Sequence, residues 1–112
     1  MSKLKAAEVC YEFINIARQL YEDKKISTLD IEILCIVYVK REQGYNVYPS
    51  DIYNLTNYRY GGEIYKRTKA LKKAGYLEEF FIKQVKRNRR HFKITVKGIN
   101  LIMPILEYNV FI

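Results

Sequence analysis

The side chains whose chemistry stands out are lysines, arginines and tyrosines in the second half of the chain. Residues 58–112 contain 13 Lys+Arg and 4 Asp+Glu, whereas residues 1–57 contain 7 Lys+Arg and 8 Asp+Glu. Cationic side chains neutralise phosphate groups, and such a one-sided excess of positive charge indicates an anionic partner. The chemistry that these residues offer is therefore the binding of a phosphate-bearing molecule.

A first group of these residues lies in a predicted helix from Gly62 to Ala74, for which Gly75 is the expected C-cap. At about 100° per residue, Ile64, Thr68 and Leu71 share the side that faces the core. The opposite side is basic and aromatic, which also suits an ordinary solvated helix face. It carries Gly62, Tyr65, Lys66, Lys69, Lys72 and Lys73.

Two glycines at the start of this helix favour phosphate binding by the basic side. Gly61 and Gly62 would let backbone N–H groups approach a phosphate closely, where the positive end of the helix dipole attracts it. The same glycines could equally serve only to turn the chain.

A second group of cations lies at the tip of a predicted hairpin. Residues 76–82 are rich in aromatic and aliphatic side chains, and apolar and polar residues alternate from Phe92 to Val96, as two paired strands would require. Like charges on a tip repel one another, so a tip without carboxylates is better explained by an anionic partner than by stability. The tip, residues 83–90, contains Lys83, Lys86, Arg87, Arg89 and Arg90.

Catalysis and metal binding find little support. His91 is the sole histidine, it lies among basic residues, and we expect it to be a contact of the hairpin or a surface residue. No glycine-rich phosphate loop, Cys-x-x-Cys or His-Glu-x-x-His motif occurs. Glu78 and Glu79 point to opposite faces of a strand and cannot easily share a proton or a metal ion. We therefore expect no enzyme, no metal site and no cofactor.

Two cysteines leave an alternative open. Cys10 and Cys35 both lie on predicted apolar helix faces, where buried free thiols are the default for an intracellular chain. A disulfide between them would instead tie the N-terminal helix to the next one, as is common in intracellular proteins of hyperthermophiles.

The elements that must position these groups form one domain of 112 residues. An N-terminal helix, residues 1–22, should bury a broad stripe that includes Val9, Phe13, Ile16 and Leu20. A second helix, residues 29–42, follows an N-cap at Ser27-Thr28 and is apolar nearly all round, so we expect it at the centre. A short strand at 45–48 and a helix that begins at Pro49 come next.

The last predicted element is a helix over residues 96–108. Thr95 is its expected N-cap, and Pro104 should kink or shorten it. No apolar run is long enough to span a bilayer, and the first residues lack the features of a signal peptide, so we expect a cytoplasmic protein without a membrane partner.

These parts, in this order, resemble the winged helix-turn-helix family and most closely its MarR-like regulators. The resemblance covers residues 28–106, with the winged-helix core at residues 28–98, and is carried by YPSDIYNLTN, GEIYKRTKALKKAGYLEE and ITVKG. It implies a mainly α fold with a small β-hairpin wing. Richness in Lys, Ile and Tyr is also similar to that of winged-helix proteins from thermophilic archaea and their viruses, in which case the host cell would be the location.

The family resemblance implies that the chain binds double-stranded DNA and regulates transcription. Tyr65, Lys66 and Lys69 match recognition-helix positions that face the major groove, and Arg87, Arg89 and Arg90 match the tip of the wing, which would follow a minor groove or the backbone. Two other functions stay open. The tyrosines could form a protein-contact patch, or they could stack on unpaired RNA bases. These tyrosines are Tyr45, Tyr48, Tyr53, Tyr58, Tyr60 and Tyr65.

The chain departs from the MarR pattern at its end. Those proteins dimerise through long terminal helices, whereas here few residues follow Gly98 and Pro104 interrupts them. The apolar residues of residues 105–112 could cover a partner's helix or fold back onto Val9 and Phe13. We favour a monomer over a homodimer.

Overall fold

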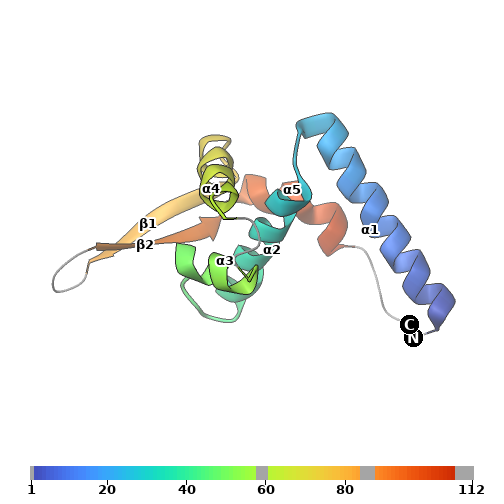
Figure 1. The fold of residues 1–112 in the computed structure, drawn as a ribbon, viewed down its shortest axis with the longest axis horizontal. Helices are drawn as coiled ribbons and strands as arrows, with labels where there is room; N and C mark the ends of the chain where they lie inside the picture. The colour runs from blue at the N-terminus through green and yellow to red at the C-terminus, as the bar shows by residue number, and fades with distance from the viewer. Residues whose placement is uncertain (1, 58–60, 84–87, 108–112) are drawn as a thin grey trace.

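A computed structural model describes residues 2–57, 61–83 and 88–107 of the chain. A two-stranded hairpin lies at one end of the molecule and the N-terminal helix at the other (Figure 1). The elements follow in the order α1 (Lys3–Lys24), α2 (Thr28–Glu42), α3 (Pro49–Leu55), α4 (Glu63–Lys73), β1 (Leu77–Lys83), β2 (Asn88–Ile94) and α5 (Val96–Leu106). The fold is thus mainly helical with one small antiparallel sheet, as the sequence predicts.

Local sequence signals explain where several helices begin and end. Ser27 Oγ accepts a hydrogen bond from the Asp30 N–H at 3.1 Å, and Thr95 Oγ1 accepts one from the Gly98 N–H at 2.9 Å. Both predicted N-caps are therefore confirmed. Helix α4 ends at Lys73 with Ala74 as its C-cap, one residue before the predicted cap Gly75, whose φ of +87° favours glycine.

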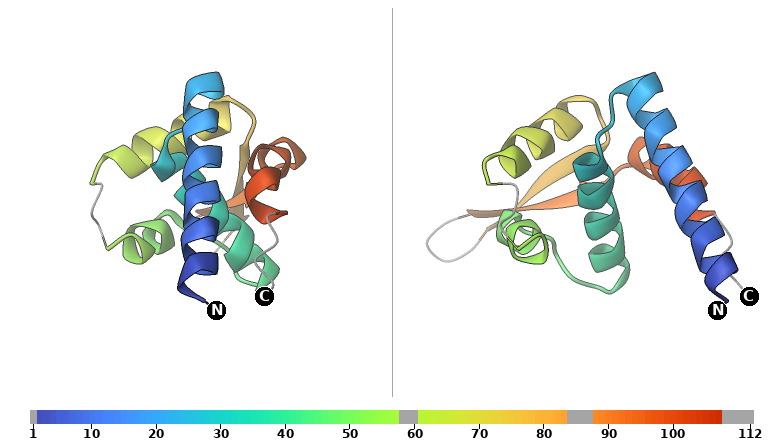
Figure 2. Two further views of the ribbon diagram at one scale, coloured as in Figure 1. Left: turned by 90° about the vertical axis from the view of Figure 1, so that its right-hand side faces the viewer. Right: turned by 45° about the vertical axis from the view of Figure 1, so that its right-hand side comes forward.

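Helix α2 forms the centre of the core. Its Ile33, Leu34 and Val37 are fully buried, and α1, α4, α5 and β2 all pack against it (Figure 2). A helix enclosed on so many sides needs apolar residues around most of its circumference. The predicted central position is confirmed.

The hairpin has a regular antiparallel register from Leu77 opposite Ile94 to Lys83 opposite Asn88. On the other edge of β2, Val47 forms a single bridge with Phe92, whose N–H donates to the Val47 carbonyl oxygen at 2.8 Å. The short strand predicted at residues 45–48 is therefore reduced to Val47, and its backbone fixes the base of the hairpin to the end of α2.

The prediction for α1 is wrong in one respect. Of its residues only Ala17 is buried, whereas Leu4 and Ile14 are 72% and 52% exposed and Phe13 is 42% exposed. The rest of the predicted stripe is half-buried, because α1 packs on α2 and α5 along one side only; these residues are Val9, Ile16 and Leu20, and Leu20 packs against the core. Its amphipathic pattern predicted the helix correctly but did not identify what covers that face.

The terminal helices differ slightly from the predicted bounds of 1–22 and 96–108. Helix α1 continues to Lys24, and α5 continues through Pro104 and ends at Leu106, close after the residue that was expected to shorten it. None of the helices in the described ranges is long and apolar enough to cross a membrane.

The turn from β2 into α5 depends on close packing at Gly98, which is buried. A Cβ added there would collide with the Tyr76 carbonyl oxygen and would lie 2.7 Å from Ile94 Cγ1. We expect Gly98→Ala to lower the free energy of unfolding by about 1–3 kcal/mol, as overpacking does. Chemical denaturation measures this change.

Gly62→Ala is the matched control, because nothing lies within 4 Å of a Cβ added at Gly62. This variant should lose less than about 1 kcal/mol. Equal stability of the two variants would contradict the packing argument at Gly98.

Candidate nucleic-acid interface

Helix α4 presents the first group of predicted contacts to solvent. Gly61 precedes it with φ of +51°, and Gly62 is its N-cap. Ile64, Thr68 and Leu71 are buried, which confirms the predicted core side. The residues predicted for the opposite side are all exposed, namely Gly62, Tyr65, Lys66, Lys69, Lys72 and Lys73.

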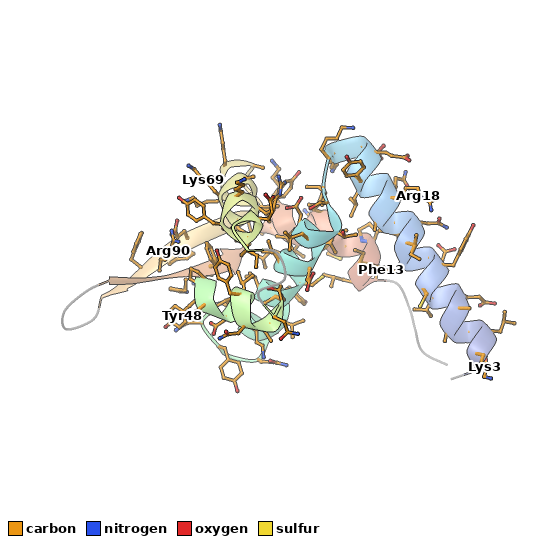
Figure 3. All side chains as sticks on the ribbon, in the orientation of Figure 1. Lys3, Phe13, Arg18, Tyr48, Lys69 and Arg90 are labelled. Atoms are coloured by element: carbon orange, nitrogen blue, oxygen red, sulfur yellow. The ribbon has the colours of Figure 1, made fainter. Side chains whose placement is uncertain are left out.

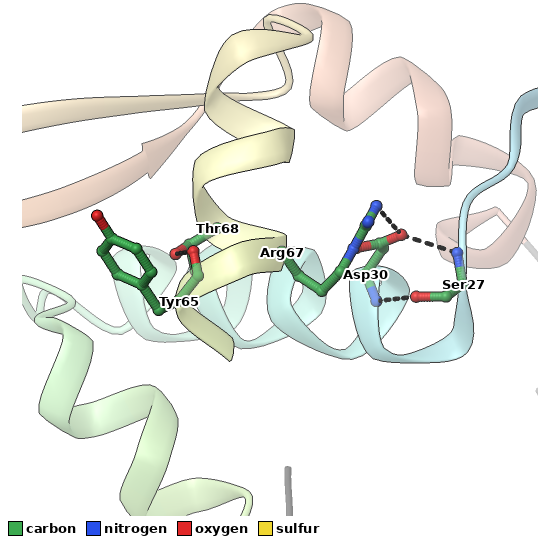
Figure 4. Close-up of polar contacts among 5 residues, drawn as sticks. All are labelled: Ser27, Asp30, Tyr65, Arg67 and Thr68. Atoms are coloured by element: carbon green, nitrogen blue, oxygen red, sulfur yellow. Dashed lines mark hydrogen bonds and ion pairs between the residues drawn. The ribbon is translucent and has the colours of Figure 1, made fainter. Parts of the chain in front are cut away.

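An ion pair between Arg67 and the buried Asp30 joins α4 to the first turn of α2. The Arg67 guanidinium donates from Nε to Asp30 Oδ1 at 2.7 Å and from an Nη atom to Oδ2 at 2.9 Å (Figure 4). The Asp30 side chain is fully buried and also accepts the Ser27 N–H at 2.8 Å. The hydrogen bond from Arg67 to Asp30 raises the pKa of the guanidinium, and the two hydrogen bonds of Arg67 fix α4 on α2.

A second carboxylate joins α4 to the hairpin. Glu79 on β1 accepts Lys72 Nζ at 2.6 Å and Arg90 Nη1 at 3.2 Å, and its side chain is only 10% exposed. Burial alone would raise the pKa of Glu79, but hydrogen bonds and charge from Lys72 and Arg90 outweigh burial and lower it. The carboxylate therefore stays ionised and holds one cation of the helix and one of the hairpin in place.

Cations from both elements line one cleft. This cleft, of about 70 Å³, lies between α4 and the hairpin, and Lys69 and Arg90 lie at the same end of the molecule, away from Phe13 and Arg18 on α1 (Figure 3). The structure thereby brings together members of the two predicted groups. The lining residues are Tyr65, Thr68, Lys69 and Lys72 from α4 and Glu79, Arg90 and Phe92 from the hairpin.

The hairpin tip is shorter than the sequence predicted. Lys83 ends β1, and Arg89 and Arg90 belong to β2, where Arg89 pairs with Ile82. A hydrophobicity pattern does not reveal this part of the hairpin, because residues 88–91 are all polar. The other two predicted tip residues, Lys86 and Arg87, lie outside the described residues.

Comparison with known proteins identifies the fold. No family model matches the chain, and no curated protein matches it. Among solved structures, it is similar to MepR, a transcription regulator of the Staphylococcus aureus multidrug efflux pump MepA, with a TM-score of 0.61 and 14% identity over 92% of this chain and 73% of that chain. The chain has a winged helix-turn-helix fold.

Two further structures of MepR are similar to the same extent. A mutant from a multidrug-resistant S. aureus clinical isolate gives a TM-score of 0.67 and 17% identity over 92% of this chain and 71% of that chain. The S. aureus MepR–DNA complex gives a TM-score of 0.63 and 18% identity over 87% of this chain and 66% of that chain. In this fold α3 and α4 form the helix-turn-helix and β1 and β2 the wing. The resemblance to proteins of thermophilic archaea and their viruses stays a prediction.

Arg67 and Glu79 are positioning residues that the sequence analysis did not identify. Asp30 and Arg67 are 37 positions apart, and a pattern within one helix cannot reveal such a contact. One local signal was available, because Ser27-x-x-Asp30 has the spacing of a capping box. Nothing local indicates that Glu79 bridges two elements.

His91 was expected to be a contact or surface residue, and that expectation is wrong. It is 6% exposed, and its Nδ1 has no hydrogen-bond partner among the described residues. The rings of Tyr48 and Phe80 lie 6.2 and 5.7 Å from the imidazole, centroid to centroid. The segment before α3 covers this face of the wing, and the sequence of β2 alone does not show that cover.

The two cysteines are both free. Cys10 is exposed on α1, which corrects the prediction of a buried thiol. Cys35 is half-buried, and burial raises the pKa of its thiol. The structure therefore contains no disulfide between Cys10 and Cys35.

The environment of His91 predicts a pH-dependent stability. Burial lowers the pKa of its imidazole, and the positive charges of Arg41 and Lys93 lower it further. The unfolded chain therefore takes up the proton first, and the free energy of unfolding should decrease as the pH falls below about 6.5 toward the lower folded-state pKa. Urea denaturation at pH 7.5 and pH 5.5 measures this decrease.

His91→Phe is the control, because His91 is the sole histidine and the substitution keeps a buried ring. This variant should lose much less stability between the two pH values than the wild type. An equal loss in both proteins would show that His91 is not its source.

Proposed function

We propose that this protein binds double-stranded DNA and regulates transcription, with α4 in the major groove and the wing on the backbone or in the adjacent minor groove. One observation carries the proposal: Lys69 of α4 and Arg90 of β2 line the same cleft. Two elements that offer cations on one face match the successive phosphates of a duplex. The likeness to MepR, which has been solved with DNA, supports it.

The proposed contacts have distinct roles. Tyr65, Lys66 and Lys69 on the middle of α4 would read base edges, while Gly62 and Lys73 at its two ends would meet phosphates. On the wing, contacts to phosphate and sugar would dominate. The wing residues assigned to this role are Lys83, Lys86, Arg87, Arg89 and Arg90.

The RNA and protein-contact alternatives predict a different surface. Tyr45 is exposed, Tyr48 and Tyr53 are half-buried, and Tyr58 and Tyr60 lie outside the described residues. Tyr65 belongs to the cationic cleft itself. Tyr45 and Tyr48 line a separate pocket, so among these tyrosines only Tyr65 supports a role beside the cations of the cleft.

Anisotropy titrations with a duplex, a single strand and a structured RNA at several salt concentrations test the proposal. We expect saturable, duplex-selective binding that weakens steeply with salt. Arg87, Arg89 and Arg90 changed together to Ala should lower affinity for every duplex and reduce the slope of log K against log salt by about 2–3, since each phosphate contributes about 0.9. Tyr65→Ala or Lys69→Ala should instead change sequence preference, by about 1–3 kcal/mol at a base pair.

Lys3, Lys5 and Lys24 changed together to Ala provide the control for charge, because they lie on α1. This variant loses the same number of cations and should keep its affinity and salt slope. If both triple variants bound equally well, or if RNA bound more tightly than the duplex, the proposal would be wrong.

The exposed face of α1 leads us to propose a homodimer in place of the monomer favoured from sequence. An apolar groove of about 410 Å³ runs along α1 beside the start of α2, and Phe13 and Ile14 in it are 42% and 52% exposed. Clustered apolar side chains on a helix favour burial by a partner. A second copy of α1 would supply matching apolar residues, and a two-fold dimer would bind an inverted repeat.

Light scattering coupled to size exclusion should give a mass of twice 13.4 kDa for the wild type. Phe13→Glu combined with Ile14→Glu should give a monomer, because charges would be buried in the interface. Val96→Glu, at a residue 75% exposed outside this groove, should leave the mass unchanged. A monomeric wild type at tens of micromolar would contradict the dimer.

A further inference from the structure

The wing carries an exposed phenylalanine. Phe81 on β1 is 65% exposed, whereas its neighbour Phe80 is half-buried. Phe80 lies against the His91 ring, and Lys93 Nζ lies 4.5 Å from its ring centroid. Two consecutive phenylalanines therefore have opposite environments, and only Phe80 contributes to packing.

The register of the wing shows which way Phe81 points. Side chains alternate along a strand, so Phe81 shares a face with Glu79, and it lies directly opposite Arg90 on β2. Glu79 on that face contacts Lys72 of α4 and is 10% exposed. Phe81 thus stands on the face turned toward α4, one pleat nearer the tip, where α4 no longer covers the sheet.

The surroundings of Phe81 favour one kind of partner. Its cross-strand neighbour Arg90 is cationic and 42% exposed, and its own strand ends at Lys83. An exposed aromatic ring contributes little to folding, and the exposed guanidinium of Arg90 beside it opposes a cationic or purely apolar partner. A duplex offers apolar base faces for the ring and, on either side of them, phosphates for the guanidinium.

We propose that Phe81 is an apolar wedge that inserts from the minor groove between two base pairs and bends the duplex. The proposal depends on the proposed DNA binding and adds to it a specificity for easily unstacked base steps. Partial unstacking by an inserted apolar side chain kinks DNA by about 20–90°. Arg90 beside the ring would hold the phosphate at the opened step.

Energy transfer between dyes at the two ends of a bound 20–30 base-pair duplex measures the bend. Wild type should increase the transfer, and Phe81→Ala should abolish the increase and weaken binding about tenfold. Phe81→Leu should keep most of the bend, since leucine also serves as a wedge. Phe81→Gln, which is polar, should behave like Phe81→Ala.

Val96→Ala is the matched control, because Val96 is 75% exposed and lies at the start of α5, outside the cleft. It should bend the duplex like the wild type. Duplex binding with the same energy transfer for wild type and Phe81→Ala would overturn the wedge and leave the proposed function intact. Absence of duplex binding by the wild type would overturn both.

Discussion

The buried carboxylate of Asp30 is the constraint on which the arrangement of helices depends. It accepts the Ser27 N–H at the start of α2 and two hydrogen bonds from Arg67 on α4. A buried charge is costly unless every oxygen is paired, so α2 and α4 have few other relative positions in which Asp30 is satisfied. A helix that presents side chains to a rigid partner needs such a fixed orientation.

Electrostatics in this protein has two separate uses. The carboxylates of Asp30 and Glu79 each hold a cation from α4 in a defined place, and Glu79 extends the same arrangement to Arg90 of the wing. Other cations of α4, such as Lys69 and Lys73, are exposed. These carboxylates set the shape of the cationic surface, and its exposed cations, Arg90 among them at 42% exposure, are available to an anionic partner.

The sequence predicted those features that a single element determines. The basic and core sides of α4, the caps at Ser27 and Thr95, and the central position of α2 all follow from periodicity and residue type. The burial of His91, the exposure of Phe13 and the role of Glu79 depend on which other segment lies against each residue. Local sequence patterns contain no information about such contacts, because the contacting residues lie far apart in the chain.

The single bridge between Val47 and Phe92 limits how much strand edge the wing exposes to other molecules. It blocks part of one sheet edge, but in the ranges that the structure describes β1 pairs with β2 alone, so its outer edge offers unpaired backbone groups. Exposed strand edges invite pairing with other molecules and hence aggregation. The exposed charge of Glu78 on β1 opposes such pairing, so a neutral substitution there would carry a risk of self-association at high concentration.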